Sequence, residues 1–313
     1  MEVIWMMWEL IGAVVGAGFA SGREIAAFFA SYGVFGYAGI AAAGAVICIL
    51  GTVQQPIQWR FRWMEQIWRI LLAAMLITTA SSMLAGAGEI AGLILPIKGA
   101  DWNGVAATYA LAWLLARKSI HGFSRISRVL LITLCGMIIA VLLDGRQERQ
   151  YVIAEGKTGW LASGLRYGGF NAALQIPILE GWREPSEKKR CVLKASLVFC
   201  ILVALGTTLL LRHPGLIAEP MPFLKAVSSW GRGGYGLFAL CLYLAILSTL
   251  IACFKGIRGM AGMLAVLALS RVGFTWVVDH LYPLLGCGCF VMLICAKFMK
   301  CGTSPFHSSA DVL

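Results

Sequence analysis

The stretch GAVVGAGFASGREIAAFF, residues 12 to 29, places groups that can bind ions and polar solutes inside an apolar segment. Glycines interrupt it repeatedly, and the charged pair Arg23 and Glu24 follows them directly. Irregular backbone inside a membrane is tolerated only where it lines a cavity or is buried in protein. The amide groups freed there, together with the Ser21 hydroxyl, can bind a carboxylate or another anion. The segment therefore predicts a binding site for a small solute.

The composition indicates an integral membrane protein. Hydrophobic residues make up 59% of the 313 residues and charged residues 13%, and the mean hydropathy is +0.81, far from the values of soluble domains. The N-terminus has no basic region typical of a cleaved signal peptide, so the first helix is expected to remain. The net charge of +11 is spread over short loops, which indicates membrane topology and argues against a nucleic-acid partner.

Ten apolar stretches come near the roughly 20 residues that cross the hydrocarbon core. Lys and Arg collect in the loops on one side, which predicts a multi-pass protein of the cell membrane with both termini in the cytoplasm. A further amphipathic segment, 216–230, is expected on the surface. The ten stretches are 3–30, 33–53, 66–94, 102–117, 126–143, 158–180, 190–211, 233–255, 260–278 and 280–298.

The two halves of the chain share a feature. A Gly-Phe pair in the first stretch (AGFAS) has a counterpart in the sixth (GGFNA), nearly half the chain away. Each half contains five of the ten stretches. Because five is an odd number of crossings, the second half enters the membrane from the opposite side, as in the inverted repeats of many secondary transporters. The predicted units are residues 1–144, residues 145–300 and a cytoplasmic tail, 301–313. The alternative is that the glycines only allow close helix packing.

The chain resembles the YkvI-like membrane proteins of bacteria, a branch of the amino acid/polyamine/organocation superfamily with the LeuT-type fold. The resemblance covers essentially the whole chain, and its motifs are VVGAGFASGREIAAFF, YGGFN, LSTLIACFKG and LYPLLG. It implies an all-α membrane protein of about ten transmembrane helices. It further implies that these helices form a five-plus-five inverted repeat with breaks in helices 1 and 6, and that the protein transports a small solute by alternating access.

A sodium site is the most specific expectation from the resemblance. In the sodium symporters of this fold, a cation lies between the first and eighth helices, and this maps onto Gly12, Val15, Ala245, Ser248 and Thr249. The last three stand at i, i+3 and i+4, on one face of a helix. Carbonyls and two hydroxyls would supply five oxygens. The alternative is that both hydroxyls bond to their own helix. No cofactor other than this Na⁺ is expected.

The substrate pocket is expected beside that site. Tyr167 and Phe170 would form its apolar wall, and the Asn171 amide would offer both a donor and an acceptor, although the aromatic rings can equally serve packing. The predicted substrate-binding residues are Gly16, Gly18, Phe19, Ser21, Tyr167, Gly169, Phe170 and Asn171.

Five charged residues within or beside the apolar stretches are gating or proton-linked candidates, because charges in a membrane are costly and often functional. Arg23 or Arg166 can pair with Glu24 or Glu89 as an outer gate, and Glu9 can accept a proton. The alternative places Glu24, Glu89 and Arg166 at the solvated interface.

Together these features predict a secondary transporter of an amino acid or a related zwitterion or anion, coupled to Na⁺. The second hypothesis is a non-transporting sensor or assembly protein that keeps the fold. An enzyme is not expected, because the sequence has no GxSG or HExxH motif. The expected partners are the small-molecule substrate and the lipid bilayer. The sequence leaves open the substrate, the choice between Na⁺ and H⁺, the direction of transport and the oligomeric state.

Overall fold

The chain folds into helices that pack along one another. A computed structural model describes residues 10–11, 17–52, 57, 59–94, 98–117, 123–144, 158–180, 185–257 and 259–298, and these contain no strand. The helices are α2 (Ala17–Ser21), α3 (Arg23–Phe28), η1 (Ala30–Tyr32), α4 (Phe35–Gly51), α5 (Arg62–Ile94), α6 (Ala100–Ala116), α7 (Phe123–Leu143), α8 (Trp160–Glu180), α9 (Pro185–Arg212), η2 (Pro214–Leu216), α10 (Pro222–Ala226), η3 (Val227–Trp230), α11 (Gly231–Gly256), α12 (Gly259–Ser270), α13 (Phe274–Trp276), η4 (Val277–Leu281) and α14 (Tyr282–Phe298).

Four helical stretches in the described chain are long and apolar enough to cross a membrane: Arg62–Ile94, Ser186–Arg212, Pro222–Gly256 and Phe274–Phe298. Shorter apolar helices accompany them. Helical structure suits this composition because a helix satisfies its backbone hydrogen bonds internally, as hydrocarbon requires. The ten-crossing inverted repeat, its two units and the orientation of the termini stay predictions.

Two predicted segments differ from the observed helices. The ninth stretch was expected to continue to residue 278, but α12 ends at Ser270 and a turn with Gly273 at φ 99° separates it from α13. Glycine adopts this conformation without strain, so the boundary falls before Phe274. The segment expected to form one surface helix forms η2, α10 and η3 instead, and Phe223 in α10 is fully buried.

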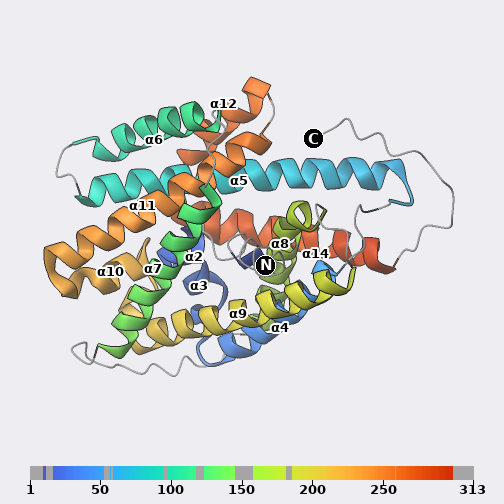
Figure 1. Ribbon diagram of the computed structural model, residues 1–313, viewed down its shortest axis with the longest axis horizontal. Helices are drawn as coiled ribbons and strands as arrows, with labels where there is room; N and C mark the ends of the chain where they lie inside the picture. Colours follow the sequence, from blue (N-terminus) through green and yellow to red (C-terminus); the bar gives the residue numbers. More distant parts are fainter. Residues whose placement is uncertain are drawn as a thin grey trace.

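Helix α8 lies between α4 and α14, and glycines bring the three backbones together. A Cβ at Gly164 would stand 2.4 Å from the Gly39 carbonyl oxygen of α4, and one at Gly169 would stand 2.7 Å from the Gly286 carbonyl oxygen of α14. Figure 1 shows α8 near the centre, with α4 and α9 along one edge and α6 and α12 along the opposite edge. Small residues allow this approach in membrane proteins.

The predicted break in the sixth helix is wrong. Helix α8 continues through Gly168 and Gly169 as an unbroken helix. A Cβ at Gly168 would meet the Ala43 carbonyl oxygen at 2.9 Å, so both glycines serve close packing, the alternative reading of the sequence.

This packing gives a stability prediction. Gly169→Ala should lower the free energy of unfolding by about 1 to 3 kcal/mol, the usual cost of overpacking, because the new methyl group would stand 2.6 Å from Phe290 Cβ. Thermal unfolding of the purified protein measures the loss. Gly136→Ala in α7 is the control, because a Cβ there has no neighbour within 4 Å. Equal unfolding temperatures for the two variants would contradict the packing role.

Candidate functional site

The first helix breaks at Gly22. Helix α2 ends at Ser21, Gly22 has φ 84° and ψ −9°, and α3 begins at Arg23. A side chain at Gly22 would be strained in this left-handed conformation, and its Cβ would also stand 2.9 Å from the ring of Phe223. The break predicted in the first helix is therefore present. Glu9, Gly12, Val15 and Gly16 lie outside the described residues.

The Ser21 hydroxyl closes the end of α2. Its Oγ donates to the Gly18 carbonyl oxygen at 2.7 Å and accepts from the Arg23 backbone N–H at 3.2 Å. Ser21 is buried, as is Phe19, whose ring meets that of Phe223 edge-on. Both residues were predicted to bind substrate, and here both stabilise the backbone of the break.

The Glu24 carboxyl group is buried directly beside the break. Its side chain is shielded by the protein, and Tyr167 Oη of α8 donates to Glu24 Oε2 at 2.8 Å. The other oxygen, Oε1, rests on Gly18, where an added Cβ would stand 1.7 Å from it. Two residues predicted to bind substrate, Gly18 and Tyr167, and one gating candidate, Glu24, thus form one cluster, which we name the Glu24 site.

Aromatic rings enclose the Glu24 site. The Tyr167 ring lies 4.8 Å from the ring of Phe28, 5.1 Å from that of Phe29 and 5.9 Å from that of Phe199. Within the described residues no cation pairs with Glu24. Because Glu24 is buried, the alternative that places it at the solvated interface is wrong. A buried carboxylate without a cation is costly. Such a group is a candidate for function.

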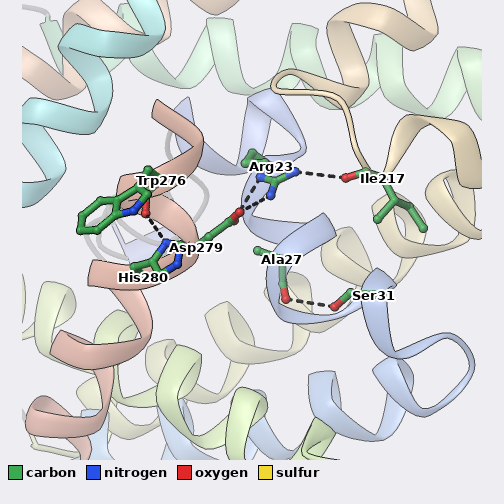
Figure 2. Close-up of polar contacts among 7 residues, drawn as sticks. All are labelled: Arg23, Ala27, Ser31, Ile217, Trp276, Asp279 and His280. Atoms are coloured by element: carbon green, nitrogen blue, oxygen red, sulfur yellow. Dashed lines mark hydrogen bonds and ion pairs between the residues drawn. The ribbon is translucent and has the colours of Figure 1, made fainter. Parts of the chain in front are cut away.

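Arg23, the neighbouring residue, points to a different partner. Its guanidinium forms a two-point ion pair with Asp279 of η4, with an Nε to Oδ1 distance of 3.1 Å, and Nη1 donates to the Ile217 carbonyl oxygen at 3.1 Å. Figure 2 shows Asp279 and the Ile217 carbonyl on two sides of the guanidinium. In the described residues the ion-pair partner of Arg23 is thus Asp279, and the pairing with Glu24 or Glu89 as an outer gate stays a prediction.

Sequence reasoning missed Asp279 as a partner. It lies in η4, a π-helical turn between α13 and α14, a feature often found at functional sites. His280 follows it, and its ring stacks on Trp276 with centroids 4.8 Å apart (Figure 2). The available signal was an acidic residue between the ninth and tenth apolar stretches, on the side of the membrane predicted to face outward.

The ion pair borders a cavity of about 350 Å³, which we name the Arg23 cavity. Arg166 lines it without an ion pair to Glu24 or Glu89 in the described chain. Its exposure agrees with the solvated alternative. Two hydroxyls on the wall bond to backbone: Ser31 to the Ala27 carbonyl (Figure 2) and Ser163 to the Phe28 carbonyl, at 2.8 Å. The polar wall consists of Arg23, Ser31, Tyr32, Ser163, Arg166 and Asp279.

Glu89 occupies a separate place. It is half-buried on α5, where it lines a cavity of about 430 Å³ with Glu219 and Lys225, and the Phe274 backbone N–H hydrogen-bonds to it.

The remaining predicted pocket residues on α8 are packed. The Phe170 ring stacks on Tyr282 with centroids 4.6 Å apart, and Asn171 Nδ2 donates to the Tyr167 carbonyl oxygen at 2.9 Å. Both side chains are buried.

The hydroxyls predicted to hold Na⁺ bond to their own helix. Ser248 Oγ and Thr249 Oγ1 both donate to the Ala245 carbonyl oxygen, at 2.8 Å and 3.1 Å. This is the alternative reading, although hydroxyl oxygens that donate keep lone pairs. Helix α11, which carries them, packs against α2, so the first and eighth stretches are neighbours as the sodium site requires.

Comparison with known proteins supports membrane localisation. No family model matches the chain. The chain is 23% identical to the "uncharacterized membrane protein YkvI" of Bacillus subtilis (strain 168) over an alignment of 341 positions, which covers 96% of this chain and 95% of the relative. The chain is therefore a membrane protein that is similar to YkvI. This similarity agrees with the predicted resemblance to YkvI-like membrane proteins. The LeuT-type fold stays a proposal.

The contact of Glu24 with Gly18 can be tested by a double-mutant cycle. Gly18→Ala should destabilise the protein because its methyl group would overlap Glu24 Oε1. Combined with Glu24→Ala, which removes the carboxyl group, it should cost less than the sum of the single changes, by about 0.5 to 3 kcal/mol. Thermal unfolding of the four proteins provides the cycle, and strictly additive losses would show that the two residues are not in contact.

The ion pair can be tested by accessibility. Asp279→Asn weakens the link between α3 and η4, so the Arg23 cavity should open more often. A cysteine introduced as Ser163→Cys should then react faster with a membrane-impermeant thiol reagent, measured above the signal of the native cysteines. Asp101→Asn is the control, because exposed Asp101 does not line the cavity. An unchanged rate in Asp279→Asn would argue against the pair as a closing contact.

Proposed function

We propose that the protein is a secondary transporter of a small solute, an amino acid or a related zwitterion or anion, that works by alternating access. The observation that carries this proposal is the break at Gly22. Directly after it, two adjacent residues send their side chains to different places: Glu24 to the buried Tyr167, and Arg23 to Asp279 beside an open cavity. In this proposal the membrane is the cell membrane and both termini are cytoplasmic.

Each part suits a transport cycle. The Arg23–Asp279 pair joins α3 to η4, so breaking it would let the two helices separate and open the Arg23 cavity. A partly exposed pair of this kind is worth less than the about 3 to 5 kcal/mol lost when one partner of a buried pair is removed. It can therefore open and close at a modest cost. These features favour transport, with a five-plus-five inverted repeat as the proposed architecture.

The same features bear on the other hypotheses. A sensor can also bind a solute in a cavity, but alternating access additionally requires a contact that opens and closes, and the Arg23–Asp279 pair beside the cavity can serve as that contact. We propose no enzymatic activity, since the residues at the break serve packing and ion pairing.

Ligand-induced stabilisation tests the proposal. Purified protein would be heated with each of the twenty amino acids, in Na⁺ or in choline buffer. A ligand present at 100 times its Kd stabilises the native state by about 2.7 kcal/mol. Uptake of the stabilising solute into proteoliposomes then separates the two hypotheses: a sensor binds it without flux, and flux above that of protein-free vesicles supports transport.

We propose Na⁺ as the coupling ion, on the resemblance and on the packing of α2 against α11. Replacing Ser248 and Thr249 together by Ala removes two of five proposed oxygen ligands. The loss of one hydrogen bond to a charged group costs about 1.5 to 3 kcal/mol. Na⁺ affinity should therefore fall at least about tenfold, as measured by the Na⁺ dependence of uptake.

The outcome also decides between two coupling sites. Unchanged uptake in the double Ala variant would show that the hydroxyls of Ser248 and Thr249 do not bind Na⁺ and only hydrogen-bond to their own helix. Wild-type uptake that ignores Na⁺ and follows a proton gradient would shift the coupling to a carboxyl group, for which Glu24 is the best-placed described residue. Glu24→Gln should then abolish the response to the gradient, with Glu89→Gln as the matched control.

A further inference from the structure

A third cavity lies away from the break, where three helices meet. It has a volume of about 420 Å³ and is bounded by the C-terminal ends of α6 and α11 and by the start of α12. Figure 1 shows the end of α6 beside α12 at one edge of the molecule. We name it the Trp113 cavity. Its side of the membrane is the one that the distribution of Lys and Arg predicts to be cytoplasmic.

Two cations line the Trp113 cavity. The Arg117 guanidinium lies over the Trp113 ring, 3.6 Å from the ring centroid, and Lys255 stands in the last turn of α11. Both side chains are exposed. A guanidinium over an aromatic ring is attracted to the face of the ring, and its N–H groups remain able to bind an oxyanion at two points.

The local charge is positive. Of the described residues that line the cavity, none is acidic. The C-termini of α6 and α11 contribute partial negative charges of about half a unit each, which is less than the two full charges of Arg117 and Lys255. The balance favours an anion at the mouth of the cavity.

The rest of the wall is apolar and firmly held. Phe254 and Met263 are buried at its base, whereas Met260 is 71% exposed at its rim. Tyr109 fixes the base: its ring packs edge-on against Phe254, with centroids 5.4 Å apart, and its hydroxyl donates to the Met263 carbonyl oxygen at 3.4 Å. A ligand that fits this wall needs an apolar part next to its anionic group.

We propose that the Trp113 cavity binds one anionic phospholipid, with the headgroup phosphate on Arg117 and Lys255 and the start of an acyl chain along Phe254, Met260 and Met263. The combination of phosphate and hydrocarbon matches the charged mouth and the apolar wall. Basic pockets between transmembrane helices are typical sites for such headgroups. This site is independent of the transport proposal, because it shares no residue with the break or the Arg23 cavity.

Native mass spectrometry of the detergent-purified protein tests the proposal. Phosphatidylglycerol and phosphatidylcholine with identical acyl chains would be titrated separately. Wild-type protein should retain phosphatidylglycerol in preference to phosphatidylcholine. Arg117→Gln with Lys255→Gln should lower the affinity for phosphatidylglycerol about thirtyfold, at the usual worth of two basic residues at a membrane surface. The affinity for phosphatidylcholine should fall much less, because its choline cation offsets the charge of its phosphate.

Two further variants separate the site from general charge. Trp113→Leu keeps both cations but removes the support of the guanidinium, so it should weaken phosphatidylglycerol binding about two- to fivefold. Arg271→Gln is the control: the Arg271 guanidinium lies 5.0 Å from the centroid of the Trp102 ring, near the other end of α12 and outside this cavity. An equal loss in Arg271→Gln would overturn the proposal.

The source of the phosphate is tested in the same experiment. Inorganic phosphate and glycerol 3-phosphate carry the anionic group without the acyl chains, so neither should displace bound phosphatidylglycerol at equal concentration. Displacement by either one, or the absence of any preference for phosphatidylglycerol in the wild type, would overturn a lipid site.

Discussion

A carboxyl group buried in an apolar interior constrains the centre of this protein. Among the described residues Glu24 has one hydrogen-bond donor, Tyr167, and its carboxyl group has room because Gly18 has no side chain. The phenol must reach Glu24 from α8, and the rings of Phe28, Phe29 and Phe199 hold that phenol in place. The break at Gly22 turns the chain between Gly18 and Glu24, so the side chain can fold back onto the preceding helix.

Close packing of α8 fixes the position of Tyr167 relative to Glu24. Glycines on α4, α8 and α14 bring backbones to distances that exclude any side chain between them. Tyr167 therefore stands on a helix that its neighbours fix from two sides. The hydroxyls and the amide that line this region are similarly restrained, because Ser21, Ser163 and Asn171 all bond to backbone carbonyls. The broken first helix thus lies next to a closely packed frame.

The sequence predicted the membrane class, most helices and the break in the first helix, because apolar length and clustered glycines are local signals. It was wrong about the sixth helix, since glycine permits both unwinding and close contact, and only the neighbouring backbone decides between them. It named Arg23, Glu24 and Tyr167 but not their partners. Pairing of Arg23 with Asp279 joins residues 256 positions apart, and no local pattern encodes such a contact. The hydroxyls of Ser248 and Thr249 show the same limit, because spacing does not specify what a hydroxyl binds.

The π turn of η4 has a consequence for the tolerance of this region to changes in length. A π turn contains one residue more than an α turn, and it is this extra residue that sets the rotation of Asp279 relative to α14. Deleting one residue within Val277–Leu281 would restore α-helical geometry and rotate the preceding segment by about 100°. Composition and hydropathy would hardly change, yet Asp279 would turn away from Arg23. A one-residue deletion here would thus change the direction in which the side chains of the preceding segment point, while the types of the remaining residues stay the same.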